Sequence, residues 1–211
     1  SMNLPRRALL GAAITLTVLA NGLPVHAQEV LNIYSARHYQ TDDALYSGFT
    51  EKTGIEINRI EAESDALIER LKSEGANSPA DVFITVDAGR VWRAEEAGLF
   101  QPVESEALNS AIPENLRHPD GLWFGFSTRA RLIYYDKTKI APGTITAYED
   151  LADPKFKGKV CIRSSSNVYN QSLLSSLIDA HGEAGAREWA QAVVDNLARK
   201  PVGGDTDQIR G

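Results

Sequence analysis

Residues 32–39 join an apolar strand pattern to three side chains that can take part in metal chemistry. They read Asn-Ile-Tyr-Ser-Ala-Arg-His-Tyr, so Arg37, His38 and Tyr39 directly follow a short apolar stretch. A phenol and an imidazole can ligate a metal ion, and a guanidinium can hold an anion or offset negative charge. We therefore expect hard-metal chemistry at this segment.

Tyrosine oxygen suits a ferric ion, which is small, highly charged and hard. The charge of the metal draws the pKa of a bound phenol down from about 10. Tyr39 follows a predicted strand end and Tyr169 lies in the first turn of a predicted helix, so both can point into a cleft between lobes. The other five tyrosines fall within strand or helix patterns, where a structural ring is expected: Tyr34, Tyr46, Tyr134, Tyr135 and Tyr148.

The other candidates each have alternative interpretations. His38 is a ligand, a hydrogen-bond partner of a ligand or a solvated loop histidine, and the sequence alone favours the last. Arg37 and Arg129 suit a solvated surface, or a position beside clustered phenolates where they would hold a small anion. The polar run 164–167 before a helix indicates capping, or else anion binding.

The order of elements predicts an α/β fold. Strands are predicted at 30–34, 55–60 and 81–85, each followed by a helix. The first helix is capped by Thr41 and ends before Gly54, the second is capped by Ser64 and ends before Gly75, and the third spans 88–97. Three βα units in succession imply a parallel sheet, whose strand carboxyl ends line a ligand crevice. The segments 34–39 and 85–87 both lie at such ends.

A second lobe is predicted after a change of pattern at Phe100. Residues 101–121 read as a connecting segment, and strands at 122–127 and 132–135 meet near Arg129, where the chain crosses over. The second lobe is predicted to hold a short helix at 148–151, a strand at 159–163 and two longer helices. The first of these helices follows Asn167 and is expected to bury Leu173, Leu174, Leu177 and Ile178. The last helix is expected to bury Ala186, Trp189, Ala190, Val193, Val194 and Leu197.

The first 27 residues have the three parts of a secretory signal. Arg6 and Arg7 precede an apolar run at 8–20, and Val25-His26-Ala27 places small residues before a cut after position 27. The run is short for a membrane span, and the arginine pair also permits a twin-arginine signal. We therefore expect an exported, soluble product.

Charge and cysteine content exclude several other classes of protein. The net charge is −6, and without residues 1–27 it would be −8, from 20 basic and 28 acidic residues, which argues against a nucleic-acid surface. Cys161 is the one cysteine, which rules out an intrachain disulfide and a four-cysteine zinc site. Its apolar neighbours predict a buried strand thiol.

Six sequence blocks, in order, resemble the periplasmic ferric-iron-binding proteins, the substrate-binding components of bacterial iron ABC transporters, in the subgroup with tyrosine-rich sites. The blocks are YSARHY at 34–39, TGI at 53–55, SPADVF at 78–83, AGLF at 97–100, DLADPKFKGKV at 150–160 and GGDTDQ at 203–208. The resemblance implies a type II periplasmic-binding-protein clamshell, with a first lobe at 28–127 and an incomplete second lobe at 128–211.

The resemblance also implies a function and a set of ligands. Tyr39 and Tyr169 would bind Fe3+ from the two lobes, His38 would be a ligand or a neighbour, and Arg37 and Arg129 would lie around the site with a small anion or water. The protein would be no enzyme but a periplasmic, monomeric carrier that delivers iron to an inner-membrane permease. Other branches of the family have a glutamate ligand where this chain has Val86.

Length is the largest departure from the family. Its members continue well beyond the position of Gly211 and carry two adjacent tyrosines there that complete the iron site. We therefore expect the chain to be the N-terminal portion of a longer protein and to bind iron weakly without those ligands.

Two other functions stay open on the sequence. One is the same clamshell tuned to an organic cation or an oxyanion, because the fold does not fix the ligand. The other is a secreted hydrolase. It is disfavoured because residues 125–129 lack the final glycine of a nucleophile elbow and no His-Glu-x-x-His motif occurs.

Overall fold

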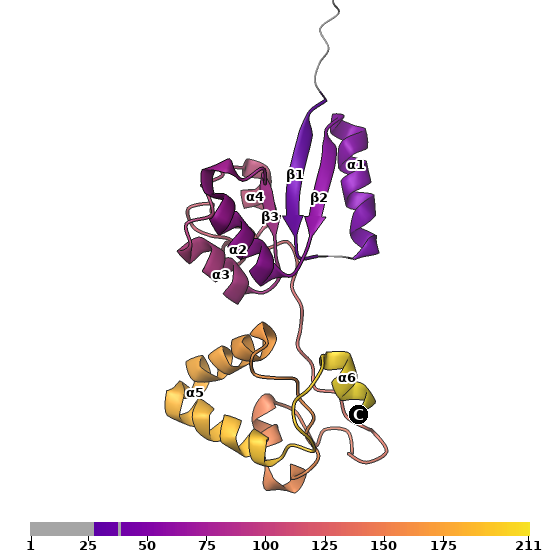
Figure 1. Cartoon of the computed structure of the whole chain (residues 1–211). Coiled ribbons are helices and arrows are strands. Elements are labelled where there is room, and N and C mark those ends of the chain that lie inside the picture. Colours follow the sequence, from indigo (N-terminus) through magenta and orange to yellow (C-terminus); the bar gives the residue numbers. More distant parts are fainter. Residues whose placement is uncertain (1–27, 38) are drawn as a thin grey trace, which may run out of the picture.

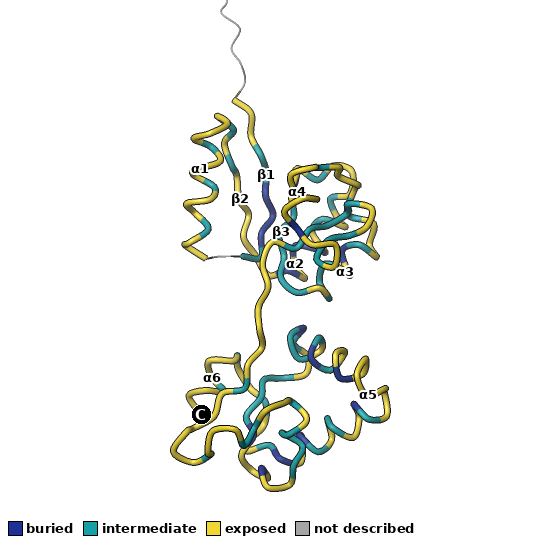
Figure 2. Tube along the Cα trace, turned by 180° about the vertical axis from the view of Figure 1, so that it is seen from behind, coloured by how far each residue is buried: buried dark blue, intermediate teal, exposed yellow. Residues whose placement is uncertain are grey.

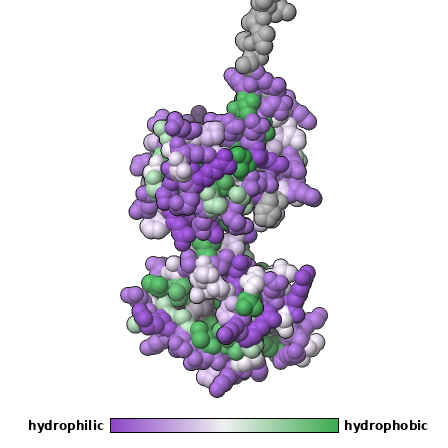
Figure 3. Space-filling model, viewed as in Figure 1, coloured by the Kyte–Doolittle hydropathy of each residue, from purple (hydrophilic) through white to green (hydrophobic). Residues whose placement is uncertain are grey.

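The structure is a computed structural model that describes residues 28–37 and 39–211. The expected signal at 1–27 and the candidate ligand His38 therefore lie outside the described residues. The described chain forms two groups of elements joined by an extended segment (Figure 1). Space-filling atoms show the same division as a narrow waist between the groups (Figure 3).

The first group is built on a three-stranded parallel sheet, as predicted. Its strands are β1 (Val30–Ser35), β2 (Glu56–Glu61) and β3 (Val82–Ile84), in the order β2-β1-β3. Helix α1 (Asp43–Thr53) lies on one side of the sheet, and α2 (Ser64–Glu74) and α3 (Ala88–Glu96) lie on the other (Figure 1). Because β1 is central, its last residues are the most deeply buried part of the sheet (Figure 2).

Two predicted helix caps are wrong. Thr41 lies within a short 3-10 turn, η1 (Gln40–Asp42), and α1 begins only at Asp43. Ser64 is the first residue of α2, where its hydroxyl lies 2.7 Å from that of Thr85. Since Ser64 is 2% exposed, this contact satisfies a buried hydroxyl and ties α2 to the segment after β3.

Glycines end the first two helices as the sequence predicts. Gly54 follows α1 with φ 75°, and Gly75 follows α2 with φ 54° and opens the 3-10 turn η2 (Gly75–Asn77). Residues with a Cβ rarely adopt such positive φ angles, so glycine is the natural residue at each stop.

The core of the first group surrounds the end of β1. Ile33, Tyr34, Leu67, Ile68 and Ala94 are all at most 5% exposed. The Tyr34 hydroxyl donates to the Glu74 carboxylate at 2.9 Å, and burial raises the pKa of this phenol. Tyr34 is therefore a structural ring, as its strand pattern predicted.

The middle of the chain departs most from the prediction. The expected connector at 101–121 contains a helix, α4 (Glu106–Ala111), capped by Ser105, and a 3-10 turn, η3 (Glu114–Leu116). The strands expected at 122–127 and 132–135 do not form, apart from an isolated bridge between Arg117 and Phe124. No strand lies beside them within the described residues, so their apolar side chains stay in solvent: Phe126 81%, Leu132 66% and Tyr134 73% exposed.

The second group is mostly helical. It contains the 3-10 turns η4 (Tyr148–Ala152) and η5 (Pro154–Phe156), the long helix α5 (Val168–Asp195) and the short helix α6 (Asp205–Arg210). The two predicted helices are the two halves of α5, which is kinked at Gly182 with φ 75°. The strand predicted at 159–163 is reduced to one bridge, between Val160 and Leu197.

Two apolar clusters hold the second group together. One contains Phe156, Val160 and Val193, the other Leu173, Leu177 and Ala186, and the half-buried Trp189 packs against both. Trp189 also donates its indole N–H to the carbonyl of Tyr148 at 2.8 Å. Two residues predicted to be buried are instead exposed, Ile178 at 39% and Val194 at 57%.

Membrane-crossing helices were searched for among residues 28–37 and 39–211. None of the helices there is both long enough and apolar enough to cross a bilayer.

Candidate functional site

The carboxyl edge of the sheet carries the first candidate segment, as predicted. The amide of Ala36 donates to the carbonyl of Ile84 at 2.8 Å, so the chain leaving β1 runs beside the chain leaving β3. The buried hydroxyl of Ser35 then accepts the amide of Arg37 at 3.0 Å and donates to its carbonyl at 3.1 Å. This local turn fixes where the segment that carries Tyr39 begins.

Arg37 is engaged by a carboxylate on the same lobe. Its Nε and a terminal nitrogen donate to the two oxygens of Asp42 at 2.9 and 3.2 Å, and this hydrogen bonding lowers the pKa of Asp42. The guanidinium also lies 4.9 Å from the centre of the Tyr39 ring. Tyr39 is 42% exposed, so its ring is partly open to solvent, and the cation beside it is paired with Asp42.

Tyr169 is placed by the start of α5. Its amide donates to the side-chain oxygen of Asn167 at 2.9 Å, which caps the helix. The polar run 164–167 therefore supports the capping interpretation, with Ser164 and Ser166 joined through their hydroxyls at 2.9 Å. The cap sets the direction in which α5 enters the second lobe.

Three guanidinium groups surround the half-buried ring of Tyr169. Arg131, Arg129 and Arg163 lie 4.6, 5.5 and 5.7 Å from its centre. The carboxylate of Asp205 contacts Arg163 at 3.0 Å and Arg131 at 3.7 Å. Three cations facing one carboxylate leave an excess of positive charge that attracts anions.

Sequence reasoning identified Arg129 but missed Arg131, Arg163 and Asp205. Arg163 is the last residue before the polar run that caps α5, and Asp205 lies in the block 203–208, so both positions carried a signal. Arg131 had none, because it lies in a segment that was predicted to run between two strands.

The described residues offer few ligand types besides tyrosine. Among residues 28–37 and 39–211, no group of three or more histidine, cysteine, aspartate or glutamate side chains could hold a metal ion. Cys161 is free and half-buried, and it lies outside any strand, so the predicted buried strand thiol is only partly right.

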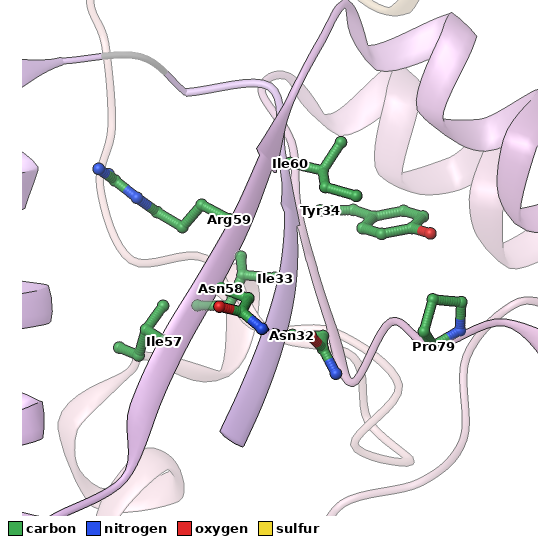
Figure 4. Close-up of a pocket in the computed structure, with 8 residues that line it drawn as sticks. All are labelled: Asn32, Ile33, Tyr34, Ile57, Asn58, Arg59, Ile60 and Pro79. Carbon is green, nitrogen blue, oxygen red and sulfur yellow. Dashed lines mark hydrogen bonds between the residues drawn. The ribbon is translucent and has the colours of Figure 1, made fainter.

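A cavity of about 410 Å³ lies elsewhere, along β1 and β2 (Figure 4). Its lining includes Asn32, Asn58, Arg59 and Pro79 but none of the candidate ligands. Because its lining contains neither tyrosine proposed as a ligand nor the arginines beside them, the cavity is not part of the candidate site.

Comparison with known proteins gives close relatives. Iron uptake protein A1 of Synechocystis is 59% identical over 182 residues, which cover 86% of this chain and 51% of that protein. A solved structure from Trichodesmium, described as IdiA or FutA in complex with iron and citrate ligands, is 62% identical with a TM-score of 0.81. Apo FutA2 from Synechocystis is 57% identical with a TM-score of 0.79.

These matches confirm the two-lobed α/β fold, and they also show how much of the relatives' length this chain covers. The chain spans about half the length of the curated relative, and the two structural matches cover 85% and 87% of this chain but 57% of each of those chains. Residues 77–208 match the model of a family described as bacterial extracellular solute-binding protein. The chain belongs to the family of bacterial extracellular solute-binding proteins.

Proposed function

We propose that the protein captures ferric iron between its two lobes and delivers it to an ABC-type importer. The observation that carries the proposal is that each lobe presents a tyrosine ring beside arginine: Tyr39 beside Arg37, and Tyr169 within three guanidinium groups. Phenolate oxygens suit a hard trivalent ion, and the arginines offset the negative charge that such ligands gather. The names of the relatives, which refer to iron uptake, support the same choice of ion.

In this proposal each residue has a defined role. Tyr39 ligates from the first lobe, at 28–127, and Tyr169 from the second, at 128–211. His38 is a ligand or its neighbour, and Arg37 and Arg129 lie outside the metal ligands. A small carboxylate such as the citrate found with the Trichodesmium relative would occupy positions on the ion that the protein leaves open, held by the arginines around Tyr169.

Capture and release follow from the chemistry of the ligands. Closure of the lobes brings both tyrosines to the ion, and the closed form is what an inner-membrane permease would recognise. Protonation of the phenolates or reduction to ferrous iron weakens the bonds and releases the ion. The family consists of solute-binding proteins, which fits a carrier rather than an enzyme. We further propose that the protein is a monomer in the periplasm. The signal at 1–27 would export it, with or without the twin-arginine route.

Ferric titration tests the proposal through the charge-transfer absorption of iron-bound phenolate. We expect the band in the parent protein, and at least an about tenfold loss of affinity in Tyr169→Phe, because an anionic ligand is removed. Tyr134→Phe is the matched control, since Tyr134 is 73% exposed and, among the described residues, no arginine lies over its ring. No band after ferric loading, or equal affinities in the two variants, would contradict the proposal.

The same titration separates the contribution of this chain from that of a longer protein. Tyr39 and Tyr169 alone leave at least half of the coordination positions of a ferric ion to water or an anion. We therefore expect a version extended to the length of the relatives to bind iron more tightly by orders of magnitude. Equal, tight binding by both versions would refute the idea that further ligands lie beyond Gly211.

A further inference from the structure

We propose that a hydrogen bond between Asp87 and Ser172 latches the two lobes together and positions Tyr169 against the first lobe. The role of Tyr169 as a ligand rests on the proposed function, whereas the latch itself does not. Asp87 follows β3 and precedes α3 in the first lobe, and Ser172 lies in the second turn of α5. Their contact joins residues that are 85 positions apart.

The geometry of the carboxylate supports a latch. The hydroxyl of Ser172 donates to Oδ1 of Asp87 at 2.7 Å, and the amide of Gly89 donates to the same oxygen at 2.8 Å. One oxygen of Asp87 thus caps α3 and holds α5. Hydrogen bonds to an ionised carboxylate are among the stronger ones in proteins, and this one is partly shielded from solvent.

The backbone at Asp87 is also unusual. With φ 71° it is the one non-glycine residue with positive φ that the structure describes across 28–37 and 39–211. Such a conformation is unfavourable for a residue with a Cβ and persists only where surrounding contacts enforce it. Here the contacts are the cap on α3 and the bond to Ser172, so the strain lies at the junction between the lobes.

Further contacts bring the same two helix ends together. A Cβ added to Gly89 would lie 3.3 Å from a methyl carbon of Val168, which is only 4% exposed. Arg93 lies 3.5 Å from the side-chain oxygen of Gln171. The start of α5 lies next to α3 in both views of the chain (Figures 1 and 2). The extended segment between the lobes is exposed, and the α3–α5 contact adds a restraint on their orientation.

Positioning of the proposed ligand follows from helix geometry. Tyr169 and Ser172 are three residues apart on α5 and therefore lie on the same face. A bond that fixes Ser172 against the first lobe also fixes the first turn of α5, with Tyr169, at a set distance from the carboxyl edge of the sheet. Asp87 is thus a positioning residue that acts through Ser172.

The latch is tested in the metal-free protein by measuring the distance between the lobes. Spin labels are placed on cysteines introduced at two exposed positions, Leu45→Cys and Lys139→Cys, in a Cys161→Ser background. We expect Ser172→Ala to lengthen and broaden the distance distribution, with an about tenfold fall in the latched population. The matched control is Ser175→Ala on the same helix, because the Ser175 hydroxyl donates to the carbonyl of Gln171 within α5 and not to the first lobe.

Variants of the acceptor sharpen the test. Asp87→Asn keeps an oxygen that can accept both bonds but loses the negative charge, so its distribution should lie between those of the parent and Ser172→Ala, whereas Asp87→Ala should resemble or exceed Ser172→Ala. If Ser172→Ala and Ser175→Ala give the same distribution, the latch is overturned. Because no metal is present in this measurement, its outcome does not depend on whether the protein carries iron.

Discussion

The charge beside the two proposed ligands differs between the lobes. Beside Tyr39, a carboxylate neutralises the single guanidinium, whereas beside Tyr169 one carboxylate faces three guanidinium groups. Arg37 donates to both oxygens of Asp42 and also lies beside the ring of Tyr39. Around Tyr169 lie three arginines, and the carboxylate of Asp205 contacts two of them, Arg131 and Arg163. The two tyrosines thus both lie beside arginine, but the charge around Tyr39 is balanced, whereas the charge around Tyr169 is positive.

This difference assigns separate tasks to the lobes. The balanced pair of Arg37 and Asp42 holds the loop after β1 in shape, and it has no spare charge to offer a ligand. The group around Tyr169 carries more positive charge than Asp205 balances, so it can accept an anion. An anion that accompanies the metal should therefore bind to the second lobe first.

The largest expected effect comes from removing a cation on each lobe in turn. Arg163→Met should weaken citrate binding about tenfold or more, because a charge-assisted bond to a carboxylate is lost. Arg37→Met should leave citrate affinity within about twofold and lower the free energy of unfolding, since Asp42 loses its partner. Titration calorimetry with citrate and urea denaturation measure the two effects. Equal losses of citrate affinity in both variants would remove the distinction between the lobes.

A change at Asp205 should act in the opposite direction. Asp205→Asn removes the carboxylate that competes for Arg131 and Arg163. We expect citrate to bind severalfold more tightly, by about 1 kcal/mol or less, because this competing pair is partly exposed. Weaker binding would instead show that Asp205 orients the arginines, and would identify it as a support for the anion site.

Smaller effects on the free energy of unfolding, of opposite sign, are expected at two glycines, one in a helix of each lobe. Gly48 lies within α1 with no atom near its added Cβ, so Gly48→Ala should stabilise the protein by about 0.5–1 kcal/mol. Gly182 has φ 75° at the kink of α5, so Gly182→Ala should destabilise it by about 1–2 kcal/mol. Urea denaturation gives both values. The same sign at both positions would mean that α5 can straighten.

The first lobe was largely predictable from sequence, because its signals are local. The alternation of strand and helix patterns located β1, β2 and β3, and Gly54 and Gly75 marked helix ends through their backbone freedom. Helix starts were less predictable. Serine is a common N-cap residue, yet the Ser64 hydroxyl forms a tertiary hydrogen bond with that of Thr85 instead.

The region from 122 to 135 shows why other parts could not be predicted. Its apolar pattern is that of strands, but a strand also needs a neighbour to accept its backbone hydrogen bonds, and the pattern carries no information on whether one is present. Arg131 was not predicted to lie near Tyr169, because the sequence does not show how this segment is placed in the fold. Tyr39 and Tyr169 could be proposed as ligands from the sequence, but the arginines around Tyr169 come together only through the fold.

The smallest effect expected is a change in acid stability that differs between the lobes. Hydrogen bonding from Arg37 lowers the pKa of Asp42, and backbone amides of Thr146 and Ala147 lower that of Asp150 in the second lobe. Both carboxylates therefore stabilise the fold above the unfolded pKa of about 3.9, and this stability is lost as the pH falls through the lower folded value.

Removing one of these carboxylates should flatten the acid response of its own lobe. Asp42→Asn should reduce the pH dependence of hydrogen exchange in α1, and Asp150→Asn should reduce it in the second half of α5, which packs on η4 through Trp189 and Tyr148. Exchange measured by mass spectrometry between about pH 3 and pH 5 resolves the two helices. If either substitution changed both lobes equally, the lobes would unfold as one unit. The α3–α5 contact at Asp87 and Ser172 would then couple them more strongly than one hydrogen bond can explain.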